Sequence, residues 1–227
     1  VLKACINEGS LEEGRRVHMI IIQSKMESDT FLANTLIDMY AKAMSIVDAI
    51  YVFNHLPIRD VVSWSVIIAG YVLHEHAHEA MHYFEEMQRS SIKPNKVTYM
   101  SALKACGKLS SLKEGRKIHM EIILNHWDIG IFLGSSLIDM YCKCRSIEDA
   151  YDIFTTISDR DAIVWNSIID GLSEIGENNE ALTLFWKMLM DEVTPDEATF
   201  VSTLKACTKL GDLLQGRWIH SHAIECG

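Results

Sequence analysis

The feature that most constrains the fold of this chain is an internal repeat with a period of 101 residues. The motif Leu-Lys-Ala-Cys begins at residues 2, 103 and 204, so two successive intervals have the same length. The same offset maps Trp64 onto Trp165 and Pro94 onto Pro195. A chain that repeats itself in this way is expected to stack copies of one structural unit, each packed against its neighbours.

Each period divides into three smaller units of 31, 35 and 35 residues. Every unit opens with a short apolar helix and then turns into a second, amphipathic helix, because apolar residues recur at helical spacing. Examples are Ile67, Ile68, Tyr71 and Val72 in a first helix and Ala80, Met81, Phe84 and Met87 in a second helix. The predicted units are 1–29 (partial), 30–60, 61–95, 96–130, 131–161, 162–196 and 197–227 (partial).

Capping patterns agree with this division. In the 31-residue units, in unit 96–130 and in the two partial units, a capping pattern precedes the predicted second helix. The pattern is a Ser or Asp followed three residues later by Glu, Asp or Gln. These pairs are Ser10 with Glu13, Ser45 with Asp48, Ser111 with Glu114, Ser146 with Asp149, and Asp212 with Gln215. No convincing strand alternation is visible. The sequence therefore predicts an all-α solenoid of helix pairs, forming one domain over 1–227.

Composition excludes several classes of protein. The 227 residues are 48% apolar and carry 31 acidic against 21 basic side chains, a net charge of −10. This is too hydrophobic for disorder, and the longest uncharged apolar stretch, 61–73, is shorter than the roughly 18 residues of a membrane span. The acidic balance counts against nucleic-acid binding through phosphate contacts alone. The chain opens at Val1 without a targeting pattern, so we expect a piece excised from a longer chain.

One sequence pattern points to metal chemistry and is weakened by the repeat. Residues His74 to His78 match the H-E-x-x-H pattern of zinc proteases, which needs both histidines on one continuous helix. The equivalent residues in the next period, 175–179, fall at a predicted turn between helices. We therefore expect a turn at His74 rather than a zinc site.

The cysteines, histidines and tryptophans that recur with the period also favour structural roles. Cys5, Cys106 and Cys207 share one helical position and are expected to be small core residues. Cys142 and Cys144 correspond to alanines in the first period, so no ligand pair or disulfide is maintained. His18, His119 and His220 are expected to pack or form hydrogen bonds, and Trp64 and Trp165 to lie in the core. No metal and no cofactor is expected.

The units resemble the plant organelle pentatricopeptide repeat proteins of the PLS subclass. The segment from Val61-Val62-Ser63-Trp64 to Pro94-Asn95 is similar to a P unit, and that from Thr98-Tyr99 through Glu114-Gly115-Arg116 to His119 is similar to an L unit. The segment from Phe132 through Leu137-Ile138-Asp139-Met140-Tyr141 to Asp161 is similar to a 31-residue S unit. Tetratricopeptide repeats, the rival, keep a uniform period of about 34 residues and a different consensus.

The resemblance implies a right-handed superhelix whose first helices line a groove for single-stranded RNA, with about one base per unit. The fifth and last residues of each unit would read the base edge, and the second residue would stack on the base face. The implied reading pairs are Asn34 with Asp60, Ser65 with Asn95, Ser135 with Asp161, and Asn166 with Asp196. The implied stacking residues are Phe31, Val62, Val97, Phe132 and Ile163. Met100, Gly130 and Val201 offer no polar group, so the L units are expected to be weak or silent.

In that family Asn with Asp favours U over C, Ser with Asn favours A, and Ser with Asp favours G. The complete units are therefore expected to read U/C, A, any base, G and U/C. The same Asn, Ser and Asp residues are also ordinary cap and turn residues, since four of them precede helix starts.

The resemblance further implies location in a mitochondrion or chloroplast and a role in recognising sites of C-to-U RNA editing. No H-x-E followed by C-x-x-C occurs, so deaminase chemistry is not expected in this chain, and we predict a binding module rather than an enzyme. The alternative is a protein-interaction scaffold whose L units bind editing cofactor proteins, which the acidic charge favours somewhat.

Overall fold

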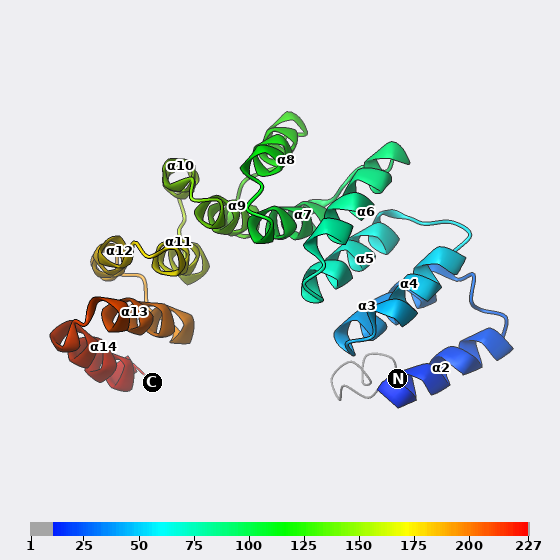
Figure 1. Ribbon diagram of the computed structural model, residues 1–227, viewed down its shortest axis with the longest axis horizontal. Coiled ribbons are helices and arrows are strands. Elements are labelled where there is room, and N and C mark those ends of the chain that lie inside the picture. The colour runs from blue at the N-terminus through cyan, green and yellow to red at the C-terminus, as the bar shows by residue number, and fades with distance from the viewer. Residues whose placement is uncertain (1–10, 227) are drawn as a thin grey trace. The chain divides into compact units, whose positions relative to one another are not determined.

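A computed structural model describes residues 11–226, so the motif residues Cys5 and Ser10 lie outside the described residues. This part of the chain forms thirteen α-helices, α2 to α14, and contains no strand (Figure 1). The expected all-α fold is confirmed. Packing divides the chain into two compact units, 1–105 and 106–227, and α7 runs through the boundary between them.

The helices alternate between two kinds. The first helices of the pairs are α3 (Thr30–Lys42), α5 (Val61–Leu73), α7 (Lys96–Lys108), α9 (Ile131–Lys143), α11 (Ala162–Ile175) and α13 (Glu197–Leu210). The second helices are α2 (Leu11–Gln23), α4 (Ile46–His55), α6 (Ala77–Arg89), α8 (Leu112–Leu124), α10 (Ile147–Thr156), α12 (Asn178–Met190) and α14 (Leu213–Cys226).

First helices pack against one another and against their own second helices. In the first unit α3 packs on α5, and in the second unit α9, α11 and α13 follow in a row (Figure 1). The predicted apolar face of α5 accounts for this, because Ile67 and Ile68 are fully buried and Tyr71 is nearly so. In α6, Phe84 is buried while Met81 is only half-buried, as suits a helix covered on one side.

The predicted caps of the second helices are only partly correct. Asp212 accepts a hydrogen bond from the backbone N–H of Gln215 at 3.0 Å, as expected. Ser45, Ser111 and Ser146 form no side-chain cap. The hydroxyls of Ser45 and Ser146 instead donate to the carboxylates three residues later, at 2.7 and 2.6 Å. A bond to a charged acceptor is stronger than one from a neutral amide, which explains the difference.

The H-E-x-x-H pattern lies at a turn, as the repeat predicted. Helix α5 ends at Leu73, Glu75 adopts a left-handed φ of 63°, and α6 begins at Ala77. His74 therefore lies before the turn and His78 after it, and His74 Nε2 is hydrogen-bonded to the carbonyl oxygen of Ala41 at 2.8 Å. Within 11–226, no three His, Cys, Asp or Glu side chains are grouped so that they could hold a metal ion.

The recurrent aromatic and sulfur residues pack as expected. Trp64 and Trp165 are 4% and 0% exposed, each edge-on to a phenylalanine of the preceding second helix. Cys106 and Cys207 are buried thiols. Across residues 11–226, no helix has both the length and the apolar character to cross a membrane.

Candidate nucleic-acid interface

The predicted reading residues lie where neighbouring first helices meet. Asn34, Ser65, Ser135 and Asn166 lie in the second turns of α3, α5, α9 and α11. Their predicted partners directly precede the next first helix, where Asp60, Asp161 and Asp196 are N-caps. The fifth residue of one helix therefore faces the N-terminus of the next, and capping and pairing become parts of one arrangement.

The pair Asn34 and Asp60 is assembled in the first unit. The Asn34 Nδ2 donates to Asp60 Oδ1 at 3.3 Å, and this oxygen also accepts from the backbone N–H of Ser63 at 2.8 Å. Asn34 is only 8% exposed, and its buried Oδ1 has no hydrogen-bond partner. A buried amide oxygen without a partner costs about 1–3 kcal/mol, so this pair contains an unsatisfied polar group.

The pair Asn166 and Asp196 is assembled in the second unit with shorter bonds. Asn166 Nδ2 donates to Asp196 Oδ1 at 2.8 Å. The hydroxyl of Thr199 donates to Asn166 Oδ1 at 2.5 Å, so the amide nitrogen and the amide oxygen each have a partner. Because Thr199 fixes the amide oxygen and Asp196 fixes the amide nitrogen, the orientation of the Asn166 side chain is determined.

The pair Ser65 and Asn95 is held through a third residue. The Ser65 hydroxyl donates to the carbonyl oxygen of Val61 in its own helix at 2.6 Å, lies 2.7 Å from the hydroxyl of Thr98, and lies 3.4 Å from Asn95 Oδ1. The backbone N–H of Thr98 donates to Asn95 Oδ1 at 2.9 Å. Since a backbone N–H can only donate, the atom that faces it is the amide oxygen, and the amide nitrogen of Asn95 lies on the other side of the same planar group.

The fourth predicted pair, Ser135 and Asp161, is not joined. The Ser135 hydroxyl donates to the carbonyl oxygen of Phe132 in its own helix at 3.1 Å. Asp161 Oδ1 accepts from the backbone N–H groups of Ile163 and Val164 at 3.0 and 3.2 Å. Each residue is satisfied locally, so the structure brings together three of the four predicted pairs.

The two joined carboxylates are good hydrogen-bond acceptors. Burial raises the pKa of Asp60 and of Asp196, but hydrogen bonds from the backbone and side chain of the third helical residue and from the paired asparagine outweigh it. Both pKa values therefore lie below the usual range for aspartate, and both groups stay ionised at neutral pH. The bonds to Ser63, Thr199 and the asparagines all end on Oδ1.

The predicted stacking residues are all exposed apolar side chains. Phe31 and Phe132 are 76% and 63% exposed, and Val62, Val97 and Ile163 between 44% and 55%. Exposed apolar side chains are common on protein surfaces, but these five recur at the second residue of five successive first helices. At the positions expected to be silent, Met100 is half-buried, Gly130 is the N-cap of α9, and Val201 is exposed.

Two groups of residues in this region were missed by the sequence reasoning. The hydroxyls of Ser63, Thr98 and Thr199 form hydrogen bonds with the last residue of the preceding unit. The sequence pattern that could have predicted them is an Asp or Asn followed three residues later by a Ser or Thr. Lys104 and Lys205 are exposed one helical turn after Met100 and Val201, and so share a helix face with them. The i, i+4 spacing was the available signal.

A second repeated cluster joins α8 to α9 and α10, and its counterpart joins α2 to α3 and α4. Arg116 pairs with Asp149 at 2.6 Å, and His119 Nδ1 is hydrogen-bonded to the Tyr141 hydroxyl at 2.8 Å. Arg15 with Asp48 and His18 with Tyr40 repeat this arrangement in the first unit. The hydrogen-bonding role expected of His18 and His119 is confirmed, whereas His220 is exposed.

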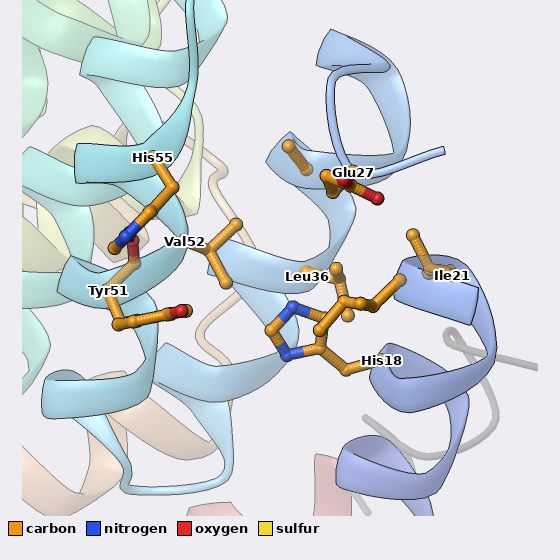
Figure 2. A pocket seen from close by; sticks show the side chains of 9 residues that line it. His18, Ile21, Glu27, Leu36, Tyr51, Val52 and His55 are labelled. Carbon is orange, nitrogen blue, oxygen red and sulfur yellow. Dashed lines mark hydrogen bonds between the residues drawn. The ribbon is translucent and has the colours of Figure 1, made fainter. Parts of the chain in front are cut away.

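A cavity of about 190 Å³ lies beside this cluster in the first unit. Figure 2 shows His18 of α2 on one side of it, with Tyr51 and His55 of α4 on the other. His55 Nδ1 is bonded to the carbonyl oxygen of Tyr51 at 2.7 Å, and the wall is otherwise mostly apolar. None of the predicted reading or stacking residues lines this cavity.

The helix pairs and the polar pairs between them define an all-α helical-repeat protein, and comparisons give its family. The PPR repeat family model matches residues 59–108 and 160–209, and the PPR repeat model matches 31–61 and 135–160. The chain belongs to the pentatricopeptide repeat family.

Curated relatives in Arabidopsis thaliana agree. A chloroplastic pentatricopeptide repeat-containing protein is 37% identical over 98% of this chain and 36% of its own length. A mitochondrial one is 36% identical over 100% of this chain and 33% of its own length. The chain thus spans about a third of the length of these relatives. These relatives confirm the expectation of a plant-type pentatricopeptide repeat protein located in a chloroplast or mitochondrion.

Solved structures establish the fold independently. The crystal structure of the pentatricopeptide repeat protein PPR10 in complex with an 18-nucleotide psaJ RNA element matches 100% of this chain and 34% of that chain, with a TM-score of 0.83 and 17% identity. The crystal structure of PPR10 from maize matches with a TM-score of 0.70 and 19% identity. The helical-repeat solenoid expected from the sequence is confirmed.

Proposed function

We propose that this chain binds single-stranded RNA and reads one base per repeat. The observation that carries the proposal is the recurrence of a polar pair between successive first helices, joined at Asn34, Ser65 and Asn166. Each joined pair lies near an exposed apolar side chain at the second position, and a base needs both an edge partner and a face partner. An RNA is known for the structural neighbour PPR10, which supports the same ligand class here.

The chemistry of the joined Asn and Asp pairs suits a pyrimidine. An amide N–H can donate to a base carbonyl oxygen, and an ionised carboxylate can accept from the N3–H of uracil. The expected order U/C, A, any base, G, U/C follows from the family pattern. Since Ser135 and Asp161 are not joined, we propose that the fourth base is read less strictly than the first, second and fifth bases.

Charge limits the affinity. The net charge of −10 opposes a polyanion, so phosphate contacts must come from local cations. Lys104 and Lys205 supply them on the helices that lack a polar reading residue. We expect micromolar or weaker binding at physiological salt, strengthened by partner proteins or further repeats.

The test is fluorescence anisotropy with a short RNA containing U-A-N-G-U, beside a scrambled RNA and the DNA equivalent, over a salt titration. The matched RNA should bind best. An Asn166→Ser variant should shift the preference at the last base from U toward G and leave the second base unchanged. Equal binding of all ligands by both proteins would contradict base reading.

The biological role proposed is site recognition for organellar C-to-U editing, as in the PLS subclass that the 31- and 35-residue units resemble. The second candidate is a scaffold for editing cofactor proteins. Exposed apolar side chains on second helices of the L type favour it: Met19, Ile20, Met120, Ile123, Leu124, Leu213 and Leu214. If the scaffold role holds, replacing Leu124 and Leu214 by glutamate should abolish the binding of cofactor proteins and leave RNA binding unchanged.

A further inference from the structure

Every joined reading pair contains a third polar residue from the following repeat. Ser63, Thr98 and Thr199 each occupy the third position of the next first helix and are fully buried. Each accepts a hydrogen bond at its hydroxyl from the backbone N–H of the N-cap residue, at 3.2, 3.3 and 3.1 Å. These are capping boxes, which account for helix stability but not for contacts with the preceding repeat.

The hydroxyls also contact the reading residues themselves. Thr199 Oγ1 lies 3.0 Å from Asp196 Oδ1 and 2.5 Å from Asn166 Oδ1. Thr98 Oγ1 lies 3.0 Å from Asn95 Oδ1 and 2.7 Å from the Ser65 hydroxyl. One buried hydroxyl therefore touches both members of a pair, although the two members belong to different helices.

The contact in the first unit is less complete. Ser63 Oγ lies 3.0 Å from Asp60 Oδ1 and makes no bond to the asparagine of the pair. Asn34 Oδ1 is the amide oxygen that lacks a partner, and the Asn34 to Asp60 bond, at 3.3 Å, is longer than the 2.8 Å bond of Asn166 to Asp196. The pair that receives both hydroxyl contacts is the tighter one.

The fourth pair supplies an internal control. After Asp161 the third position is Val164, which is fully buried and has no hydroxyl. Asp161 is held by backbone N–H groups alone. The Ser135 hydroxyl donates to its own helix, as that of Ser65 also does, but Ser65 has in addition the hydroxyl of Thr98 beside it. The absence of the hydroxyl coincides with the only one of the four pairs that is not joined in the described part of the chain.

We infer that the hydroxyl at the third position of each following first helix is a positioning residue for the base reader of the preceding repeat. It ties the last residue of one repeat to the fifth residue of the same repeat, so the amide or carboxylate group meets the base edge in one orientation. A valine at this position leaves the pair apart and the base poorly discriminated. This inference rests on the proposed base reading.

The test compares variants of the 227-residue chain at one base. Thr199→Val keeps the shape of the side chain and removes the hydroxyl, and Thr199→Ser keeps the hydroxyl. Anisotropy titrations with U or G at the last base, and with A or G at the second base, measure discrimination at two repeats. Thr199→Val should lower the preference for U over G about fivefold and leave the second base unchanged, as expected for one lost hydrogen bond. Thr199→Ser should behave as wild type.

A gain-of-function variant tests the same idea in the other direction. Val164→Thr should join Ser135 to Asp161 and raise the preference for G over A at the fourth base about fivefold. Circular dichroism melting confirms that each variant folds. Unchanged discrimination in folded Thr199→Val, or equal loss at both bases, would overturn the positioning role alone. A wild-type chain without any base preference would overturn the proposed function and this inference with it.

Discussion

The spacing of first helices depends on a glycine that faces a small residue, and this gives a sharp stability prediction. Gly171 in α11 packs against Cys142 in α9, where an added Cβ would lie 2.7 Å from both the Cβ and the Sγ of Cys142. The equivalent Gly70 in α5 faces Ala41, where the same added atom would lie 3.1 Å from the Ala41 Cβ. Changing each glycine to alanine therefore tests the same position in two successive 101-residue periods.

The two substitutions should have opposite signs. At Gly171 the new atom lies about 0.7 Å inside ordinary contact with a Cβ atom that cannot rotate away, so α11 must move from α9. Overpacking of this kind costs about 1–3 kcal/mol, against a gain of about 1 kcal/mol from replacing glycine in a helix. We expect Gly171→Ala to destabilise by about 1 kcal/mol. At Gly70 a shift of a few tenths of an ångström suffices, and the gain in helix propensity should leave the variant neutral to about 1 kcal/mol more stable.

Urea unfolding followed by circular dichroism measures the sign, and hydrogen exchange of α9 and α11 amides locates the change. Local measurement is needed because stability in repeat proteins is distributed over neighbouring repeats. Gly171→Ala should accelerate exchange in α9 and α11 and leave α3 and α5 unchanged. If Gly171→Ala stabilised the chain as much as Gly70→Ala does, the inferred close contact between α9 and α11 would be wrong.

Two further predictions concern protonation and thiol chemistry. Burial lowers the pKa of His119 below its usual value, only partly offset by Asp149, so the folded state binds this proton less readily than the unfolded state. The free energy of unfolding should therefore fall as the pH drops below about 6.5, with a smaller fall in His119→Gln, measured by urea midpoints at several pH values; equal slopes would contradict this. Burial raises the pKa of Cys106 and of Cys142 to about 12, whereas Cys144 is half-buried. Iodoacetamide should label Cys144 before Cys106 and Cys142, as read by peptide mass mapping, and equal rates at these three thiols would refute the burial argument.

Much of the fold could be predicted because the repeat makes each feature visible more than once. The offset of 101 residues identified the turn at His74 from its counterpart, and it placed Trp64 and Trp165 together in the core. Apolar spacing predicted the buried face of α5. These features depend on burial, which a periodic pattern reports directly.

The parts that could not be predicted depend on competition between hydrogen-bond partners. Ser45 and Ser146 match a capping pattern, but their hydroxyls donate to the carboxylates of Asp48 and Asp149, which also bind an arginine of the preceding second helix. Ser135 and Asp161 match a reading pair, but each finds a closer partner in its own helix. The type of a residue determines which groups it can bind, but the structure determines which of several neighbours it does bind.

The proposed base reading depends on two successive repeats and not on one. Asn166 and Asp196 belong to one repeat, but Thr199, which contacts both, belongs to the next. Moving residues 162–196 alone into another context would separate the pair from its hydroxyl, whereas moving 162–199 would keep it. Asp196 keeps its bond to the Asn166 amide nitrogen in both grafts, so the three added residues decide whether the amide oxygen also has its partner Thr199. A graft of 162–196 followed by valine at the third position should therefore bind RNA with weaker preference for U than a graft of 162–199.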